Sequence, residues 1–451
     1  MTLLVDGKAA FPEILRCIAA AQRSVRVNMF IWRDDTIGNR IAAALLEAEG
    51  YLPLSESCGW SLEAGRGYYV TRNGSSLIAF RVPKSLKGGF LMAAAHSDSP
   101  TFKIKENPEH PAVGHYIQLN TEKYGGSLMA TWFDRPLSVA GRVLVQQDGA
   151  IAVKPVAVEE DLLVIPSVAI HMNRSANDGM KYQANVDTYP LFGDEQAAGA
   201  FMDTVAKAAG VEKDAILGHD LFLYCRQKGT LVGCDGKMML SPKLDDLECA
   251  WSLMQGFLAA EEGESLPVCC VFDNEEVGSE TKQGAASTFL RDTLRRIVLG
   301  LGGSEEQLLT MLAQSFLVSA DNAHARHPNH PEYADGDNAP FMNKGIVIKY
   351  NANQRYATDG VSAAIFRSVC KAAGVETQVY ANRSDLPGGG TLGSIANTHV
   401  PVNTVDIGLA QLAMHSVCET AGVQDLADLC KAMEVYFGKT LTKQGAGEYR
   451  L

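Results

Sequence analysis

The alternation of short apolar runs with longer segments of helical spacing is the feature that most constrains the fold of this chain. It begins near residue 238 and continues almost to the C-terminus. Apolar runs at 268–272, 316–319, 346–350 and 402–406 predict strands, and 246–261, 284–299, 359–373 and 423–438 predict helices. Strands that alternate with helices are typical of an α/β fold built on a doubly wound mixed sheet with helices on both faces.

The residues before 238 divide into further parts. Gly67–Thr71 and Ser76–Phe80 flank the turn Asn73-Gly74, which predicts a hairpin, and Gly89–Ala95 reads as a strand buried on both faces. From residue 101 the pattern changes to many short β-type runs with frequent Gly and Pro. We therefore predict an α/β domain at 49–100 and 238–451, an inserted β-rich domain at 101–237, and a separate N-terminal segment at 1–48.

Composition and charge exclude several classes of function. The 451 residues include 40 Lys and Arg against 52 Asp and Glu, and this net charge of −12 without a basic cluster argues against nucleic acid as a partner. No apolar run reaches the roughly 18 residues that span a bilayer, so we expect no membrane contact. The N-terminus lacks the layout of a secretory signal. Ten cysteines without a C-x-x-C pair favour a reducing cytoplasm.

Acids and histidines gather in five segments, most of which directly follow an apolar run. Because ligands in open α/β sheets bind at the carboxyl ends of strands, we expect these segments to converge. Taken singly, each has a simpler interpretation: His96 as a structural histidine, Asp245 or Asp246 as a helix N-cap, and His415 as a core residue. The segments are Ala95–Pro100, Ser241–Leu247, Val271–Ser279, Leu317–His324 and Leu412–Ser416.

The residue types in these segments suit a metal centre. Three of the four residues Asp273–Glu276 are acidic, and packed together they need a cation to stay ionised; the alternative is a solvated acidic turn. Asp98 lies two residues after His96 and is placed to fix its tautomer. Imidazoles and carboxylates together suit two zinc-like ions that share one carboxylate. A G-x-S-x-G motif is absent and the cysteines are scattered, so we predict no Ser or Cys nucleophile.

In combination these segments resemble the aspartyl aminopeptidases, a family of dinuclear zinc exopeptidases. The similarity runs from about Gly50 to Phe437. The resemblance implies a metal-dependent enzyme that removes N-terminal Asp or Glu from peptides with a water held between two zinc ions. It rests on motifs in the same order, namely Thr71–Ile78, His96–Pro100, Ser241–Asp245, Asp273–Ser279, Ser319–Asp321, Asn353–Thr358 and Gln411–Ser416.

The resemblance also implies roles for individual residues. Glu275 would be the general base and Asp98 would orient His96, both as catalytic residues. Asp245 would bridge two Zn²⁺ per subunit, with Mn²⁺ or Co²⁺ able to substitute. The implied metal ligands are His96, Asp245, Glu276, Asp321 and His415.

Three further residues are implied to bind substrate. Lys349 would receive the acidic side chain of the substrate, although without the resemblance it reads as a surface lysine. His324 would contact the substrate, and His171 in the inserted domain would reach the active site of a neighbouring subunit. The resemblance implies that the inserted domain is a dimerisation domain and that the protein is a homododecamer.

The first 48 residues depart from this family. Ile14–Glu47 instead resembles the opening strand and helix of phospholipase D-type enzymes. That chemistry requires H-x-K followed by Asp, and none of the ten histidines is followed two residues later by Lys. We therefore predict no lipid-transferring activity and interpret residues 1–48 as an atypical segment.

Two other functions stay open from the sequence. One is a deacylase or carboxypeptidase on the same dinuclear scaffold, which hydrolysis of blocked but not free N-termini would favour. The other is a non-catalytic assembly protein, which would bind no metal and show no chelator-sensitive activity.

Overall fold

The computed structural model describes residues 35–445 and 447–451. Most of the predicted phospholipase D-type segment therefore lies outside the described residues, and that resemblance stays a prediction. The end of the segment forms helix α2 (Asp35–Ala48), which leads into the first strand.

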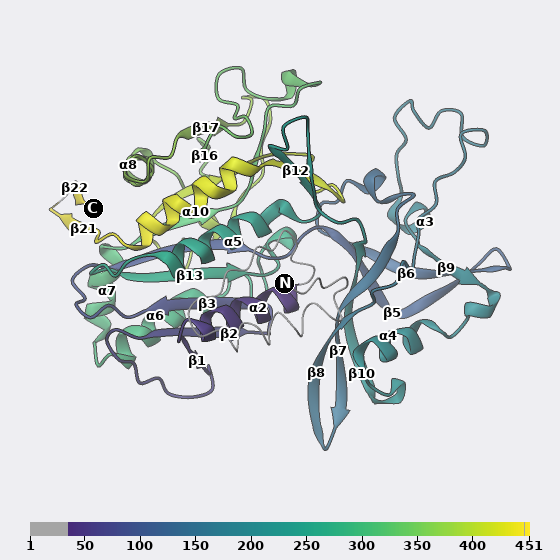
Figure 1. Ribbon diagram of the computed structural model, residues 1–451, viewed down its shortest axis with the longest axis horizontal. Coiled ribbons are helices and arrows are strands. Elements are labelled where there is room, and N and C mark those ends of the chain that lie inside the picture. Colours follow the sequence, from purple (N-terminus) through teal and green to yellow (C-terminus); the bar gives the residue numbers. More distant parts are fainter. Residues whose placement is uncertain (1–34, 446) are drawn as a thin grey trace.

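The central sheet carries the residues of the predicted α/β domain (Figure 1). Its middle strands β13, β4, β14 and β18 are parallel, while β3 and β16 run antiparallel to their inner neighbours. The predicted hairpin is present as β2 and β3. In spatial order the strands are β1 (Leu52–Leu54), β2 (Gly67–Arg72), β3 (Ser76–Arg81), β13 (Leu266–Phe272), β4 (Phe90–His96), β14 (Phe316–Ala320), β18 (Asn403–Gly408), β16 (Ile346–Tyr350) and β17 (Thr377–Ala381).

Helices cover both faces of this sheet because its buried strands are apolar on both sides. In β4, Leu91, Ala93 and Ala95 face one core while alternate residues such as Phe90 and Met92 face the other. The doubly wound mixed α/β fold is thereby confirmed. One face carries α2, α5 (Leu244–Ala259), α8 (Gly360–Ala373) and α10 (Val423–Phe437), and the other carries α6 (Phe289–Gly300), α7 (Glu305–Ala313) and α9 (Leu392–Ala396).

The helix predicted at 284–299 begins later than expected. Residues before Phe289 form turns, in which Gly284 N–H donates to the Thr281 carbonyl. A Cβ at Gly284 would lie 2.1 Å from the Ser279 carbonyl oxygen, so this close approach requires glycine. Helix α7 was not predicted; its only buried residue is Leu308, and an apolar stripe that narrow gives little periodic signal.

The inserted segment forms a second sheet beside the central one, on the right of Figure 1. Helix α4 (Phe201–Ala209) packs on this sheet through Phe201 and Val205, so the segment is mostly but not wholly β. We call it the module; its sheet order is β8 (Ala150–Ala157), β7 (Leu137–Gln147), β10 (Ile216–Cys225), β5 (Thr101–Ala112), β6 (Tyr116–Tyr124) and β9 (Leu191–Asp194).

A bridging sheet connects the module to the rest of the chain. Its order is β11 (Thr230–Val232), β12 (Met238–Ser241), β20 (Glu419–Gly422), β19 (Ala410–Leu412) and β15 (Ala323–His324). The predicted boundary at residue 237 falls between the paired strands β11 and β12, and the division into domains stays a prediction. In the part of the chain that the structure describes, no helix is long and apolar enough to cross a membrane.

Candidate metal centre

The predicted ligand residues come together at one edge of the central sheet. His96 is the last residue of β4, and Asp321 directly follows β14. Strands β13, β4 and β14 are parallel, with Phe272 beside His96, so their carboxyl ends point to the same side. Asp245 lies at the start of α5, before its regular helical turns, and no side chain caps that helix.

Among the described residues, two groups of side chains are placed to hold a metal ion. The first is His96, Asp245 and Asp321, and the second is Asp245, Glu276 and His415; within each group the ligand atoms lie within 4.8 Å of one another. Asp245 belongs to both groups. Its Oδ1 lies 3.7 Å from His96 Nε2, and its Oδ2 lies 3.4 Å from His415 Nε2.

Two orphaned oxygens show that this set of residues fits a cation. Asp245 Oδ1 and Glu276 Oε1 are buried and have no hydrogen-bond partner among the described residues. Burying a carboxylate oxygen that has no hydrogen-bond partner costs free energy of folding. A divalent cation bound by these oxygens removes that cost. Nitrogen and oxygen donors of this kind suit zinc, and the residues present therefore fit the metal that the sequence predicted.

The carboxylates of this centre are in electrostatic conflict when no cation is present. Burial raises the pKa of Glu275 to about 8; His96 opposes this shift, while Asp321 and other acids add to it. Burial also raises the pKa of Glu276 and Asp321. Burial would raise the pKa of Asp245 too, but its contacts with His415 and His96 hold it below the ordinary value. A bound cation favours the ionised form of all these groups.

Asp98 lies beside His96 and offers both its backbone carbonyl and its carboxylate to the ring. His96 Nδ1 lies 3.1 Å from the Asp98 carbonyl oxygen and 3.4 Å from Asp98 Oδ1. The Asp98 carboxylate also accepts from the Glu275 and Glu276 N–H groups at 3.0 and 3.1 Å. Burial opposes ionisation of Asp98, but the hydrogen bond with His96 and these further donors hold its pKa below the usual value.

Sequence reasoning missed Tyr124, the last residue of β6 in the module. Its hydroxyl donates to Asp98 Oδ2 at 2.7 Å and accepts from Asn274 Nδ2 at 2.8 Å. The tyrosine thus connects the module to the carboxylate beside His96. The local sequence around a tyrosine at the end of a β-type run does not indicate a contact with a distant carboxylate.

Sequence reasoning also missed Glu419, the first residue of β20. One of its oxygens accepts from Asp245 N–H at 3.0 Å and the other accepts from His415 N–H at 2.7 Å. Burial raises the pKa of Glu419 to about 8, and the nearby Asp245 adds to the shift. One carboxyl group therefore holds the backbone of two predicted ligands.

The module fixes the orientation of His415. Its Nδ1 lies 3.2 Å from the Gly126 carbonyl oxygen, and its own carbonyl accepts from Leu128 N–H at 2.9 Å. Two residues further on, Val417 N–H donates to Thr131 Oγ1 at 3.0 Å. His415 is thus held by residues of both the module and the bridging sheet.

The residues predicted to bind substrate lie in different places. Lys349 is buried, with 2% of its side chain exposed; its Nζ donates to the Asp321 carbonyl at 2.7 Å and lies 3.7 Å from Asp321 Oδ1. His324 lines a cavity of about 390 Å³ with Tyr380 and residues near His415. His171 is exposed in the module and is not part of the centre in its own chain.

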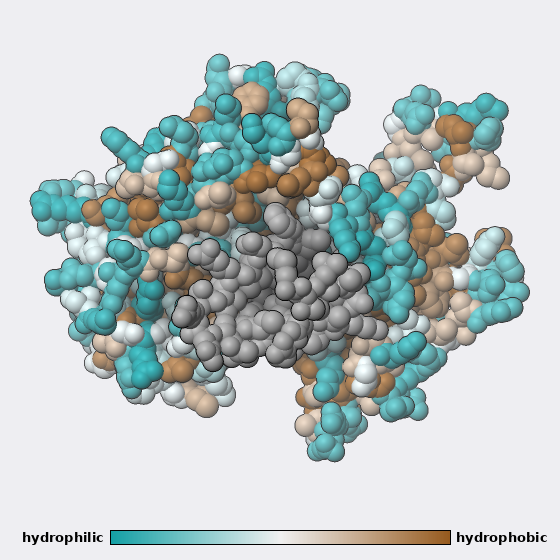
Figure 2. Space-filling view, viewed as in Figure 1, coloured by the Kyte–Doolittle hydropathy of each residue, from teal (hydrophilic) through white to brown (hydrophobic). Residues whose placement is uncertain are grey.

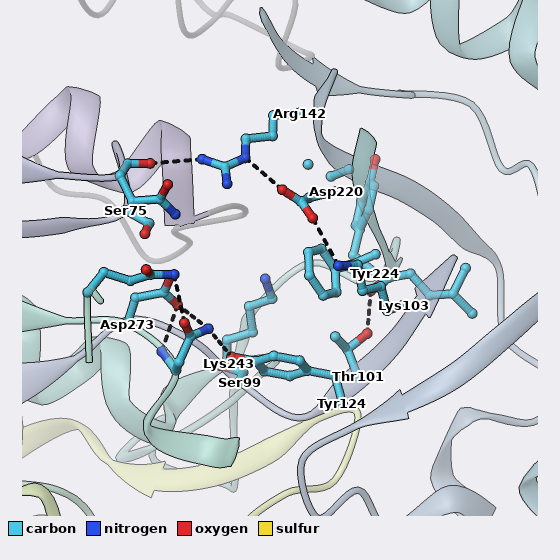
Figure 3. A pocket seen from close by; sticks show the side chains of 17 residues that line it. Ser75, Ser99, Thr101, Lys103, Tyr124, Arg142, Asp220, Tyr224, Lys243 and Asp273 are labelled. Carbon is cyan, nitrogen blue, oxygen red and sulfur yellow. Dashed lines mark hydrogen bonds and ion pairs between the residues drawn. The ribbon is translucent and has the colours of Figure 1, made fainter. Parts of the chain in front are cut away.

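A second cavity of about 250 Å³ lies between the module and the central sheet, and Tyr124 is one of the residues that line it (Figure 3). On the module side of this cavity, Asp220 accepts from Lys103 Nζ and Arg142 Nε at 2.9 Å each. Arg142 also donates to the Asn73 carbonyl at 2.8 Å, which ties the module to the turn between β2 and β3.

The doubly wound sheet places a buried histidine and carboxylates at its strand ends, and His415 of a neighbouring loop completes the set. This fold and site suit the class of metal-dependent hydrolases. Residues 37–437 match the family model of the aminopeptidase I zinc metalloproteases, M18. The chain therefore belongs to the M18 family of zinc aminopeptidases. The match begins inside the segment that we assigned to an atypical N-terminus.

Individual relatives agree with this assignment. A probable M18 family aminopeptidase 2 of Clostridium novyi is 41% identical over 406 residues, covering 88% of this chain and 94% of that protein. The solved Ape4 in a complex with Nbr1 is 32% identical with a TM-score of 0.87, covering 99% of this chain and 91% of that one. In the mApe1 dodecamer of S. cerevisiae the identity is 27%, the TM-score 0.79 and the coverage 95% and 96%.

Proposed function

We propose that this M18 aminopeptidase removes N-terminal Asp or Glu from peptides and that it does so with two zinc ions per subunit. The observation that carries the proposal is the pair of ligand groups that share Asp245, with Glu275 beside them. In this proposal Mn²⁺ or Co²⁺ can substitute for zinc.

The metal-holding residues follow from the two groups. His96 and Asp321 would complete one position and Glu276 and His415 the other, with Asp245 between them. Ions bound there would supply Lewis acidity towards the peptide carbonyl and lower the pKa of bound water. In this proposal Asp98 orients His96 through Nδ1, which leaves the lone pair of Nε2 available to bind a metal ion.

Glu275 is the proposed general base. Its backbone N–H is fixed by Asp98, so its side chain starts from a defined position beside Glu276. Its pKa near 8 in the absence of cations falls when cations bind nearby, which favours the carboxylate that accepts a proton. The same group then returns the proton to the leaving amine.

Lys349 is the proposed determinant of acidic specificity. Its ammonium group is buried beside Asp321 and lies 5.1 Å from the ring centre of Tyr356. A buried positive charge adjacent to the centre lowers the energy of a substrate carboxylate placed near it. His324 lines the neighbouring cavity, where we propose that it contacts the substrate.

We also propose a homododecamer located in the cytoplasm, with the module as its dimerisation domain and His171 reaching a neighbouring active site. A solved relative of this fold is a dodecamer. Figure 2 shows hydrophobic surface over the module on the right. The exposed apolar residues of the module include Ile151, Ile170 and Met172. A contiguous apolar surface is typical of an interface that is buried by assembly. Mass photometry measures the oligomeric state directly.

A substrate panel tests the proposal. The zinc-loaded protein is assayed with p-nitroanilides of Asp, Glu, Leu and Ala, and metal is counted by plasma mass spectrometry. We expect two zinc ions per chain and a kcat/KM at least about tenfold higher for Asp and Glu than for Leu and Ala, equivalent to about 1.4 kcal/mol. Equal rates on all four substrates would reject the acidic specificity, and one ion at full activity would reject the paired centre.

A further inference from the structure

The cavity of about 250 Å³ between the module and the central sheet has no part in the proposed mechanism. We call it the boundary cavity. None of the five predicted metal ligands lines it. Ligand pockets in proteins commonly measure about 300–1,000 Å³, so a cavity of this size suits a small molecule and not a peptide.

Basic residues outnumber acidic ones on the walls of the boundary cavity. The basic residues are Lys103, Arg142 and Lys243, and the acidic ones are Asp220 and Asp273. Burial opposes ionisation of Asp220, but its hydrogen bonds with Lys103 and Arg142 hold its pKa below the ordinary value. One carboxylate therefore serves two cations. The walls carry an excess of positive charge in a chain whose net charge is −12.

The guanidinium group of Arg142 is only partly used by the protein. Its Nε donates to Asp220 at 2.9 Å, and its Nη1 donates to the Asn73 carbonyl at 2.8 Å. Its Nη2 has no hydrogen-bond partner among the described residues, and Figure 3 shows this third nitrogen on the side that faces the cavity. Arg142 is thus held in a fixed position with N–H groups left for a ligand.

Lys243 brings a third cation into the cavity from outside the module. It directly precedes α5, and Figure 3 shows its side chain extending into the space between Asp273 and Lys103. Its backbone φ is 60°, in the left-handed region that residues other than glycine seldom adopt. Strained positions of this kind are found mostly at functional sites, where the surrounding structure enforces them.

We propose that the boundary cavity is a binding site for a small oxyanion, a phosphate or a carboxylate, which bridges the basic residues of the module to Lys243 and steadies the metal centre. Arginine recognises such groups with N–H bonds in a fixed planar geometry, and lysine attracts them as a point charge. Binding is non-covalent and reversible.

The ligand would reach the metal centre through contacts on both sides of the cavity. Tyr124 lines the cavity and donates to Asp98 Oδ2 at 2.7 Å. Lys243 lies two residues before Asp245, which belongs to both ligand groups. An anion that binds only while the module and Lys243 face each other stabilises that arrangement, and with it the positions of Asp98 and Asp245.

Isothermal titration calorimetry on the zinc-loaded protein tests the site, with inorganic phosphate and acetate as separate probes. We expect one saturable site per chain, and the tighter of the two anions identifies the preferred chemistry. Lys243→Gln and Lys103→Gln change opposite sides of the cavity. Each should weaken the affinity for that anion by about tenfold or more, because each removes one charged donor.

The matched control is Lys123→Gln, an exposed lysine beside Tyr124 that does not line the cavity, which should bind the anion as the natural protein does. Lys243→Arg keeps the charge and should retain binding. Absence of saturable binding would overturn the site. Unchanged affinity in Lys243→Gln would place the anion elsewhere, including on the metal ions, and would overturn it too.

The rate at which the protein loses zinc to excess EDTA tests the link to the metal centre. Saturating anion should slow this loss by about fivefold or more in the natural protein and in Lys123→Gln, but not in Lys243→Gln. Equal rates with and without anion would refute the link. None of these measurements uses a peptide substrate, so the acidic specificity proposed above can fail without affecting this inference.

Discussion

At the scale of single residues, the centre concentrates acids whose charges repel one another. Glu275, Glu276 and Asp321 all have raised pKa values because they are buried together. Such groups bind cations tightly because the cation removes both the repulsion and the cost of burial. Their roles can be separated by substitutions that keep shape and remove charge.

Glu275→Gln should bind zinc as the natural protein does and yet lose turnover. The amide cannot accept the proton, so kcat should fall by about 10²–10⁴ with KM little changed. Steady-state kinetics and metal counting measure both. Glu280→Gln, an exposed glutamate of the same loop, is the control. A Glu275→Gln enzyme with near-normal kcat would remove Glu275 as the base.

Lys349→Met should raise KM for Asp and Glu substrates far more than for Leu and Ala substrates. Methionine keeps most of the buried volume but removes the charge, so roughly 1–3 kcal/mol of selectivity should disappear. Kinetics on the four p-nitroanilides measure the ratio, with the exposed Lys344→Met as control. Equal effects on all four substrates would assign Lys349 to supporting the Asp321 carbonyl instead.

The sequence allowed the convergence of these segments to be predicted, because most of them directly follow an apolar run, while the choice of individual ligands came from the family resemblance. His96 and Asp321 sit at ends of parallel strands, where the fold class alone brings them together. Tyr124 and Glu419 could not be predicted, because their roles exist only as contacts between parts of the chain far apart in sequence.

At the scale of elements, β6 carries a side chain from the module to the edge of the central sheet. Tyr124→Phe should lower kcat/KM about tenfold, because Asp98 loses a donor and holds His96 less firmly. Zinc titration should show weaker binding in parallel. Tyr116→Phe, at the exposed start of the same strand, should change neither quantity. Similar losses in both variants would point to the strand and not to the hydroxyl.

Element types were easier to predict than their arrangement. Buried strands such as β4 and β14 are continuous apolar runs, and the amphipathic α10 has a clear helical period. The order of strands in the sheet and the antiparallel direction of β16 are decided by packing between distant segments, which local sequence does not encode. The bridging sheet joins strands of both predicted domains and left no local signal.

At the scale of the whole molecule, stability should depend on pH in opposite ways with and without metal. Burial raises the pKa of Glu275 and Glu419 from 4.5 to about 8 in the folded chain without cations. As pH rises, the unfolded chain loses the protons of these two carboxyl groups at a lower pH than the folded chain does. The stabilisation that comes from the protonated carboxyl groups is therefore complete below about pH 4.5 and is lost as pH rises through about 8.

The melting temperature of chelator-treated protein should therefore fall between about pH 5 and about pH 9. Zinc-loaded protein should not follow this trend, because ligand binding requires ionised carboxylates and strengthens with pH. Scanning fluorimetry measures both series. A metal-free protein that gains stability over this range would contradict the protonation states assigned here.

The hold of the module on His415 limits how this enzyme can be shortened. The ring of that histidine contacts the Gly126 carbonyl, and its own carbonyl accepts from Leu128 N–H. Two residues further on, Val417 N–H donates to Thr131. Deleting the insertion to obtain a minimal peptidase would leave the histidine free to rotate, at an entropic cost to every catalytic cycle. A chimera made from two relatives should therefore take the inserted module and the segment around His415 from the same parent.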